Sequence, residues 1–347
     1  MITDIDKLIK ELPKEKKKLF NKIFKVVVTK GKLNPPKEMY SWIKQNFESI
    51  KNVKTQKIVR IDNIITNEGT LFNCLRSMRP IQTAKETPDL SKKDPFCNPL
   101  TLTPEDTFGR IKGKHCVTAS NIAKYDGLHG LIIFNRHNPL KFNKEEVEDY
   151  IDASLNWFKA GNKHDKKAVY PFLMWNCLWR SGASIVHGHM QVNLTKKRHY
   201  NKIEFLRKAA KKYKGNYFDD LFEIHKQIGL GFNYKNVKVM ANLTPIKEKE
   251  VVLISNEMSD DLKETIYKTL KCFVDELGVR SFNLAVLMRP LIKIKGWEEF
   301  PIIARIVERG DLNAKTTDIG GMELYAGNNV VSSDPFKVAK ILMGCLK

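Results

Sequence analysis

The chain has 347 residues, enough for one large domain or two fused ones, and its 60 lysines and arginines against 39 acidic residues give a formal net charge of +21. This charge suits anionic ligands such as phosphorylated small molecules, although a lysine-rich surface also arises without any partner. No apolar run approaches the roughly 20 residues that cross a membrane, and the residues after Met1 lack an apolar signal segment. We therefore expect a cytoplasmic protein that has no membrane partner and whose six cysteines are mostly buried and reduced.

The first 55 residues are rich in lysine and carry apolar residues at helical spacing. One stripe runs from Ile5 to Leu12 and ends near Pro13, and a second includes Leu19, Phe20, Ile23 and Phe24. We interpret residues 1–55 as a lysine-rich helical extension that packs on the main domain with a solvated basic face. An appendage that binds nucleic acid or a protein partner is the alternative.

From residue 56 onward the pattern changes, and the order strand, strand, helix, strand, strand occurs twice. The first helix begins after Asn143, which forms a capping box with Glu146, and the second begins at Ser259 and stops at Gly278. The predicted strands are 116–120, 131–134 and 170–178 before the Arg180–Gln191 stretch, and 237–241, 251–255, 282–288 and 302–307 in the second half. We therefore predict an α+β fold with an internal duplication, in which residues 56–200 form the first repeat and 201–347 a second, degenerate repeat.

The stretch from Arg180 to Gln191 carries the chemistry. If it is a strand, His187, His189 and Gln191 lie on one face, because side chains alternate along a strand. A neutral imidazole is a nucleophile at neutral pH, and a glutamine amide can hold a phosphoryl oxygen but cannot supply a proton to a poor leaving group. The row therefore predicts nucleotidyl transfer through a histidine–phosphate intermediate. Two structural histidines on a half-buried strand are the alternative.

Further polar groups are candidates for binding phosphate. Ser184 lies in a Ser-Gly-Ala-Ser segment, whose hydroxyls and free N–H groups suit phosphate oxygens. Arg76 and Arg79 stand three residues apart before Pro80, and two guanidinium groups can clamp a phosphate. Because such an arginine pair is common, this motif on its own is weak.

Taken in order, these motifs resemble the galactose-1-phosphate uridylyltransferase branch of the histidine-triad superfamily, which includes sugar-nucleotide and diadenosine tetraphosphate phosphorylases. The resemblance runs from about residue 57 to 345. The motifs that carry it are Arg76-Ser-Met-Arg79-Pro80, Asp94-Pro-Phe-Cys97, Thr118-Ala-Ser-Asn121, His137, Asn176, Ser184, His187-Gly-His189-Met-Gln191 and Gly321-Met-Glu323. It implies two tandem histidine-triad-like repeats that form an antiparallel sheet flanked by helices, with the N-terminal helical extension outside it.

The resemblance also implies the roles of the site residues. His189 would attack the α-phosphorus of a nucleoside diphosphate compound, and an acceptor phosphate would then take the nucleotidyl group from the histidine. Gln191 and Ser184 would hold phosphoryl oxygens. The remaining implied residues are Asn121 in the nucleotide pocket, Asn176 beside the active-site loop, Arg76 or Arg79 as electrostatic support, and Glu323 at the sugar.

The metal site implied by the resemblance is altered in this chain. Leu100 stands where the family has a second cysteine, so one thiolate is missing. Cys97, His137 and His187 could bind zinc if a fourth ligand came from elsewhere, and His187 would otherwise be structural. We expect that no cofactor is required and that the purified protein holds less than one equivalent of zinc, with bound zinc as the alternative.

We predict a nucleotidyltransferase of the hexose-1-phosphate uridylyltransferase type, whose partners are a nucleotide or nucleotide sugar and a phosphorylated acceptor. A dinucleoside polyphosphate or nucleotide-sugar phosphorylase is the alternative within this class. A histidine-triad hydrolase is disfavoured because Gln191 replaces a third histidine, and a nucleic-acid-binding protein is disfavoured because no recognisable RNA-binding motif is present. Ile122 follows Asn121 where uridylyltransferases tend to have aspartate, so the sequence does not identify the base of the nucleotide. It does not decide whether the protein forms a homodimer either.

Overall fold

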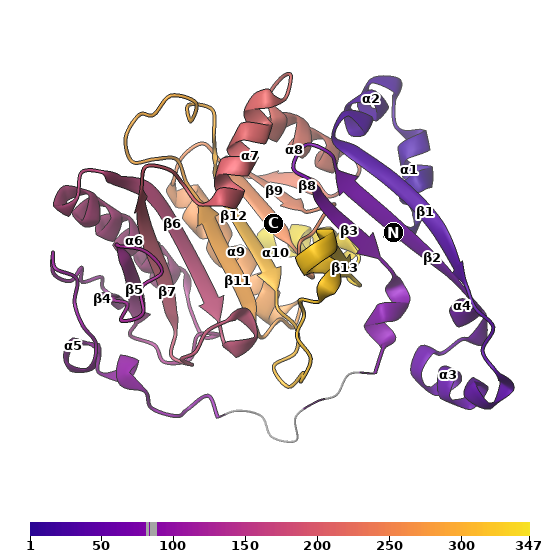
Figure 1. Cartoon of the computed structure of the whole chain (residues 1–347), viewed down its shortest axis with the longest axis horizontal. Helices are drawn as coiled ribbons and strands as arrows, with labels where there is room; N and C mark the ends of the chain where they lie inside the picture. Colours follow the sequence, from indigo (N-terminus) through magenta and orange to yellow (C-terminus); the bar gives the residue numbers. More distant parts are fainter. Residues whose placement is uncertain (81–82, 84–88) are drawn as a thin grey trace.

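The computed structural model describes residues 1–80, 83 and 89–347, and it contains two sheets flanked by helices (Figure 1). This arrangement confirms the predicted α+β fold. The large sheet has the order β4 (Cys116–Ser120), β5 (His129–Phe134), β7 (His189–Lys196), β6 (Ala168–Cys177), β11 (Phe282–Leu287), β12 (Ile302–Glu308), β10 (Val251–Ser255), β9 (Val237–Ala241) and β8 (Gly231–Tyr234). The small sheet has the order β1 (Phe24–Lys32), β2 (Thr55–Asn63), β3 (Glu68–Phe72) and β13 (Asn328–Val331).

The order of strands in the large sheet makes the duplication visible. Its first four strands run β4, β5, β7, β6, and the next four run β11, β12, β10, β9, which is the same order reversed. The third strands of the two repeats, β6 and β11, pair antiparallel at the centre, with Phe282 opposite Cys177. The two repeats therefore share one continuous sheet. Apart from β7 and β8, the bounds predicted for its strands agree with the structure to within about two residues, and so do those predicted for the two long helices.

The N-terminal segment contains the expected helices and also a strand, which the sequence analysis missed. Residues 24–32 form β1, which pairs antiparallel with β2, so that Val28 lies opposite Val59. Three consecutive valines follow Lys25, and β-branched side chains favour a strand. The first 55 residues thus supply an edge strand of the small sheet, at the opposite end of the molecule from β4 and β5 (Figure 1). Their helices are α1 (Ile5–Glu11), α2 (Lys14–Ile23), α3 (Tyr40–Phe47) and α4 (Ile50–Lys54).

Three helices cover one face of the large sheet. α6 (Lys144–His164) contacts the strands of the first repeat, α9 (Asp260–Asp275) contacts β9 and β10, and α10 (Pro335–Leu346) packs on α9. The predicted capping box of α6 is present, with reciprocal hydrogen bonds between Asn143 and Glu146. The other helices of the described chain are α5 (Pro99–Leu102), α7 (Asn201–Lys212) and α8 (Tyr217–Gln227). No helix in the described ranges has both the length and the apolar character needed to cross a membrane.

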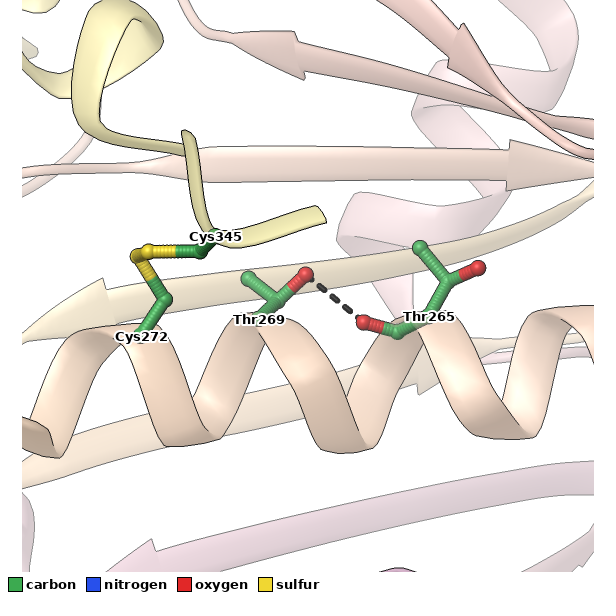
Figure 2. The surroundings of a disulfide bond; sticks show 4 residues. All are labelled: Thr265, Thr269, Cys272 and Cys345. Atoms are coloured by element: carbon green, nitrogen blue, oxygen red, sulfur yellow. Dashed lines mark hydrogen bonds between the residues drawn. A yellow bond between two sulfur atoms is a disulfide. The ribbon is translucent and has the colours of Figure 1, made fainter. Parts of the chain in front are cut away.

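A disulfide joins two of these helices. Cys272 on α9 is bonded to Cys345 near the end of α10 (Figure 2). Cys272 lies one turn after Thr269 on α9, and the Thr269 hydroxyl donates to the backbone oxygen of Thr265. For this pair the expectation of reduced cysteines is therefore wrong. The spacing of the cysteines could not reveal it, because the two thiols meet only when α10 packs on α9.

Candidate functional site

The candidate site lies where β7 begins. The strand expected over residues 180–191 is wrong in its first part, because β7 starts at His189 and residues 178–188 form a turn and a loop. Leu178 and Gly182 have the positive φ angles 67° and 97°, which bend the chain out of the extended conformation. Within β7 the alternation holds, since Met190 and Val192 are fully buried in the core. His189 and Gln191 therefore share the opposite face.

The geometry of His189 prepares one nitrogen as a nucleophile. Its Nδ1 lies 2.8 Å from the backbone oxygen of His187, which can only accept a hydrogen bond. The proton is therefore on Nδ1, and the lone pair is on Nε2. The ring packs edge-on against Phe96, and burial lowers the pKa of His189, so its neutral form is favoured.

Three residues expected at the metal site lie together, and the structure adds a fourth. Suitable ligand atoms of Asp94, Cys97, His137 and His187 all lie within 4.8 Å of one another. The sulfur of Cys97 is 3.4 Å from Nδ1 of His137 and 3.6 Å from Nδ1 of His187, and the two nitrogens are 3.1 Å apart. Asp94 Oδ1 lies 3.7 Å from Nδ1 of His187. Asp94 therefore offers a fourth candidate ligand where Leu100 offers none.

These distances fit a tetrahedral zinc ion. Zinc bonds of about 2.0–2.1 Å to nitrogen and about 2.3 Å to sulfur place neighbouring ligands roughly 3.3–3.6 Å apart at tetrahedral angles. His187 is also set for metal binding, because its Nε2 donates to the backbone oxygen of Phe134 at 2.7 Å and leaves the lone pair on Nδ1. His137 Nε2 is buried and has no partner in the described part of the chain. A thiolate, a carboxylate and two imidazoles form a donor set that zinc accepts.

Gln191 makes its contact with a residue that sequence analysis missed. Its Oε1 lies 3.1 Å from Nε2 of His129, a fully buried histidine at the start of β5. Asn121, expected in the nucleotide pocket, is close to the same ring, with Nδ2 3.3 Å from His129 Nε2. Sequence analysis missed His129 because no motif surrounds it. The pairing of β5 with β7 places it beside Gln191.

Asn176 is held by the second repeat. Its Oδ1 accepts a hydrogen bond of 2.7 Å from Asn283 on β11, and Asn283 in turn accepts one of 2.6 Å from Arg309. Arg309 is paired with Asp318 at 2.7 Å. Sequence analysis missed Asn283, Arg309 and Asp318, because they belong to the repeat that lacks the histidines.

The other expected site residues are more dispersed. Ser184 is exposed in the loop before His187, whereas Arg76 and Arg79 are exposed in and after the 3-10 turn Cys74–Met78, which follows β3 of the small sheet. Glu323 lies in the short π-helix Met322–Ala326, where its carboxylate accepts from the backbone of Gly320 at 2.9 Å. The structure thus joins His189, Gln191 and the metal ligands in one place, and the roles expected for the two arginines and Glu323 stay predictions.

With the geometry described, the chain can be compared with known proteins. No protein-family profile matches the sequence, and no curated protein matches it either. Solved structures do match, and three of them are 13–16% identical. An ADP-glucose phosphorylase from Arabidopsis thaliana with bound ADP-glucose is 16% identical, with a TM-score of 0.63 over 81% of this chain and 97% of that one.

Two further structures agree. A GalT-like protein from Arabidopsis thaliana is 16% identical, with a TM-score of 0.60 over 81% of this chain and 97% of that one. A uridylyltransferase is 13% identical, with a TM-score of 0.57 over 83% of this chain and 98% of that one. The chain therefore shares its fold with these three proteins, and the fold implied by the resemblance seen in the sequence is confirmed.

Proposed function

We propose that this chain is a nucleotidyltransferase that works through a nucleotidyl intermediate on His189. Its donor is a nucleoside diphosphate sugar, and its acceptor is a sugar 1-phosphate or phosphate. The observation that carries the proposal is the hydrogen bond from His189 Nδ1 to the backbone oxygen of His187, which leaves the Nε2 lone pair available. The fold shared with a sugar-nucleotide phosphorylase and a uridylyltransferase supports the same class of reaction.

In the first half-reaction the Nε2 lone pair attacks the α-phosphorus of the donor. A nitrogen–phosphorus bond forms, the bond from the α-phosphorus to the bridging oxygen breaks, and the sugar 1-phosphate departs with the electron pair. This leaving group is already a stable anion and requires no proton, which suits Gln191 in place of an acid. The amide of Gln191 can donate to the phosphoryl oxygens as negative charge builds on them.

In the second half-reaction an oxygen of the acceptor phosphate attacks the same phosphorus, and the bond to Nε2 breaks. A phosphate arrives already ionised, whereas water would need a general base that Gln191 cannot provide. The strongly basic chain attracts such anions. The first half-reaction of a phosphorylase is identical, so the acceptor alone separates the transferase from the phosphorylase.

We also propose that Asp94, Cys97, His137 and His187 bind zinc. A site closed by four protein ligands is structural, and the ion supplies a rigid junction between the 94–97 segment, the end of β5 and the loop before β7. His187 would thereby be fixed on both sides, by the ion at Nδ1 and by Phe134 at Nε2. Its backbone oxygen would then hold the His189 ring in place.

The test uses the whole protein and a panel of nucleotides and nucleotide sugars radiolabelled at the α-phosphate. We expect an acid-labile label on His189 that persists in buffer and is discharged rapidly by inorganic phosphate or a sugar 1-phosphate. Discharge at the same rate without either acceptor would make the protein a hydrolase. If no donor labels the protein, the proposed function is wrong, and the lysine-rich N-terminal segment becomes the candidate for nucleic-acid binding.

A further inference from the structure

The side chain of His129 lies beside that of Gln191 and is completely buried. It stands at the first residue of β5, two residues before Leu131, which is the register partner of Gln191 on β7. His129 and Gln191 are therefore diagonal neighbours on the same face of the sheet. Its Nε2 lies 3.1 Å from Gln191 Oε1, within hydrogen-bonding distance.

The tautomer of His129 follows from its other nitrogen. Nδ1 lies 3.0 Å from the backbone nitrogen of Tyr125, and a backbone N–H can only donate. Nδ1 therefore carries the lone pair, and Nε2 of the neutral ring carries the proton. Burial lowers the pKa of His129, which supports the neutral ring at neutral pH.

The Nε2 proton has one clear acceptor. The side chain of Asn121 is also near, but its Oδ1 accepts from the backbone nitrogen of Ala123 at 3.0 Å, which turns its NH2 group toward His129. Two N–H groups cannot hydrogen-bond to each other, so His129 donates to Oε1 of Gln191. In the described part of the chain no protein atom hydrogen-bonds to the Gln191 NH2 group, which is left to face the site.

We propose that His129 is a positioning residue, which holds the Gln191 carbonyl oxygen and so directs the Gln191 NH2 group toward the phosphoryl oxygens of the intermediate on His189. This inference rests on the proposed function. Without the His129 donor, the amide could rotate and present its oxygen to the phosphoryl group. The amide oxygen would then face the negatively charged phosphoryl oxygens, and the N–H group that stabilises the developing charge would be lost.

The first experiment measures the rate at which the labelled intermediate forms in a single turnover. We expect His129→Phe to slow this step by about 100–1000-fold, as loss of one oxyanion donor does, and Gln191→Ala to slow it similarly. The double variant should be no slower than Gln191→Ala, because the two residues act as one unit. His129→Asn, which keeps an N–H donor, should recover part of the rate.

The control is His164→Phe, which makes the same change on the exposed end of α6 and should leave the rate unchanged. A merely structural role of His129 predicts the opposite pattern. The losses of the two single variants would then add in the double variant, and His129→Asn would be no faster than His129→Phe. Either result would overturn the proposal.

A second measurement separates this proposal from the proposed function and needs no turnover. The chain has five glutamines, so selective heavy-nitrogen labelling resolves the side-chain NH2 signal of Gln191, identified by its loss in Gln191→Ala. We expect this signal to move in His129→Phe and not in His164→Phe, and labelled His129 to show a protonated Nε2. An unmoved Gln191 signal or a protonated Nδ1 would overturn the proposal even if no nucleotide labels the protein.

Discussion

The two repeats use the same strand for opposite purposes. In the first repeat Gln191 on β7, the last residue of the row, lies between Leu131 and Met174 of its neighbouring strands. In the second repeat Arg305 on β12 lies between Val252 and Ala285. In the described part of the chain the NH2 group of Gln191 has no hydrogen-bond partner, whereas the guanidinium of Arg305 lies 2.6 Å from both Glu250 and Glu68.

What covers each face explains the difference. In the second repeat, the small sheet supplies Glu68 from β3, so that Arg305 becomes part of an internal ion-pair network. In the first repeat, the covering groups are Phe96 and the metal ligands, which leave one nitrogen of His189 with its lone pair. The two repeats have the same strand order, and their side chains decide which copy carries the candidate site and which one joins the two sheets.

The largest expected effect is on the chemistry of the first repeat. His189→Ala should lower turnover by several orders of magnitude, because the covalent intermediate cannot form. Its melting temperature should stay close to that of the parent, since among the described residues the histidine ring hydrogen-bonds only to His187. Turnover equal to the parent's would show that His189 is not the nucleophile. The proposed distinction between the two repeats would then fail as well.

Metal removal should affect the first repeat next. We expect metal analysis to find one equivalent of zinc, in place of the smaller amount expected from the sequence, because Asp94 completes the ligand set. Cys97→Ser or a chelator should release the ion, lower the melting temperature and slow labelling of His189. The exposed Cys74 provides the matched control as Cys74→Ser. A protein that contains little zinc, and melts at the same temperature with chelator, would favour the metal-free expectation.

The second repeat should respond in stability and not in chemistry. Arg305→Met leaves Glu250, which is buried, and Glu68 without their cation, and breaking such a buried pair lowers the free energy of unfolding by about 3–5 kcal/mol. Replacing both glutamates by glutamine in the same variant should restore much of this loss. Well below the melting temperature, the folded Arg305→Met protein should still label His189. Loss of labelling in the folded protein would show that the second repeat takes part in the chemistry.

The disulfide should affect stability alone, by no more than the ion pairs of Arg305 do. Cys345→Ser opens a link between residues 73 apart in sequence, and the chain-entropy estimate for such a loop is up to about 4 kcal/mol of unfolding free energy. Chemical denaturation of the variant and the parent, each with and without reductant, measures this loss. Labelling of His189 should not change, since the link joins α9 to α10. A parent whose stability does not respond to reductant would show that the link does not form in solution.

The amino-acid sequence by itself determined the repeated order of strands and helices, the capped start of α6 and the row that contains His189 and Gln191. These features are local, because alternation along a strand and helix caps depend on residues that are close in the chain. It also brought out Cys97, His137 and His187 as a group through an ordered motif set.

Only the tertiary structure decided the rest. Asp94 beside the other three candidate metal ligands, His129 beside Gln191 and Asn283 beside Asn176 each meet their partners across paired strands or loops distant in the sequence. The run from residue 24 to 32 could have continued a helix, and it is a strand because β2 offers it a partner along its whole length. Contacts between distant residues have no period in the sequence, so they become visible only when the sheet brings the two segments together.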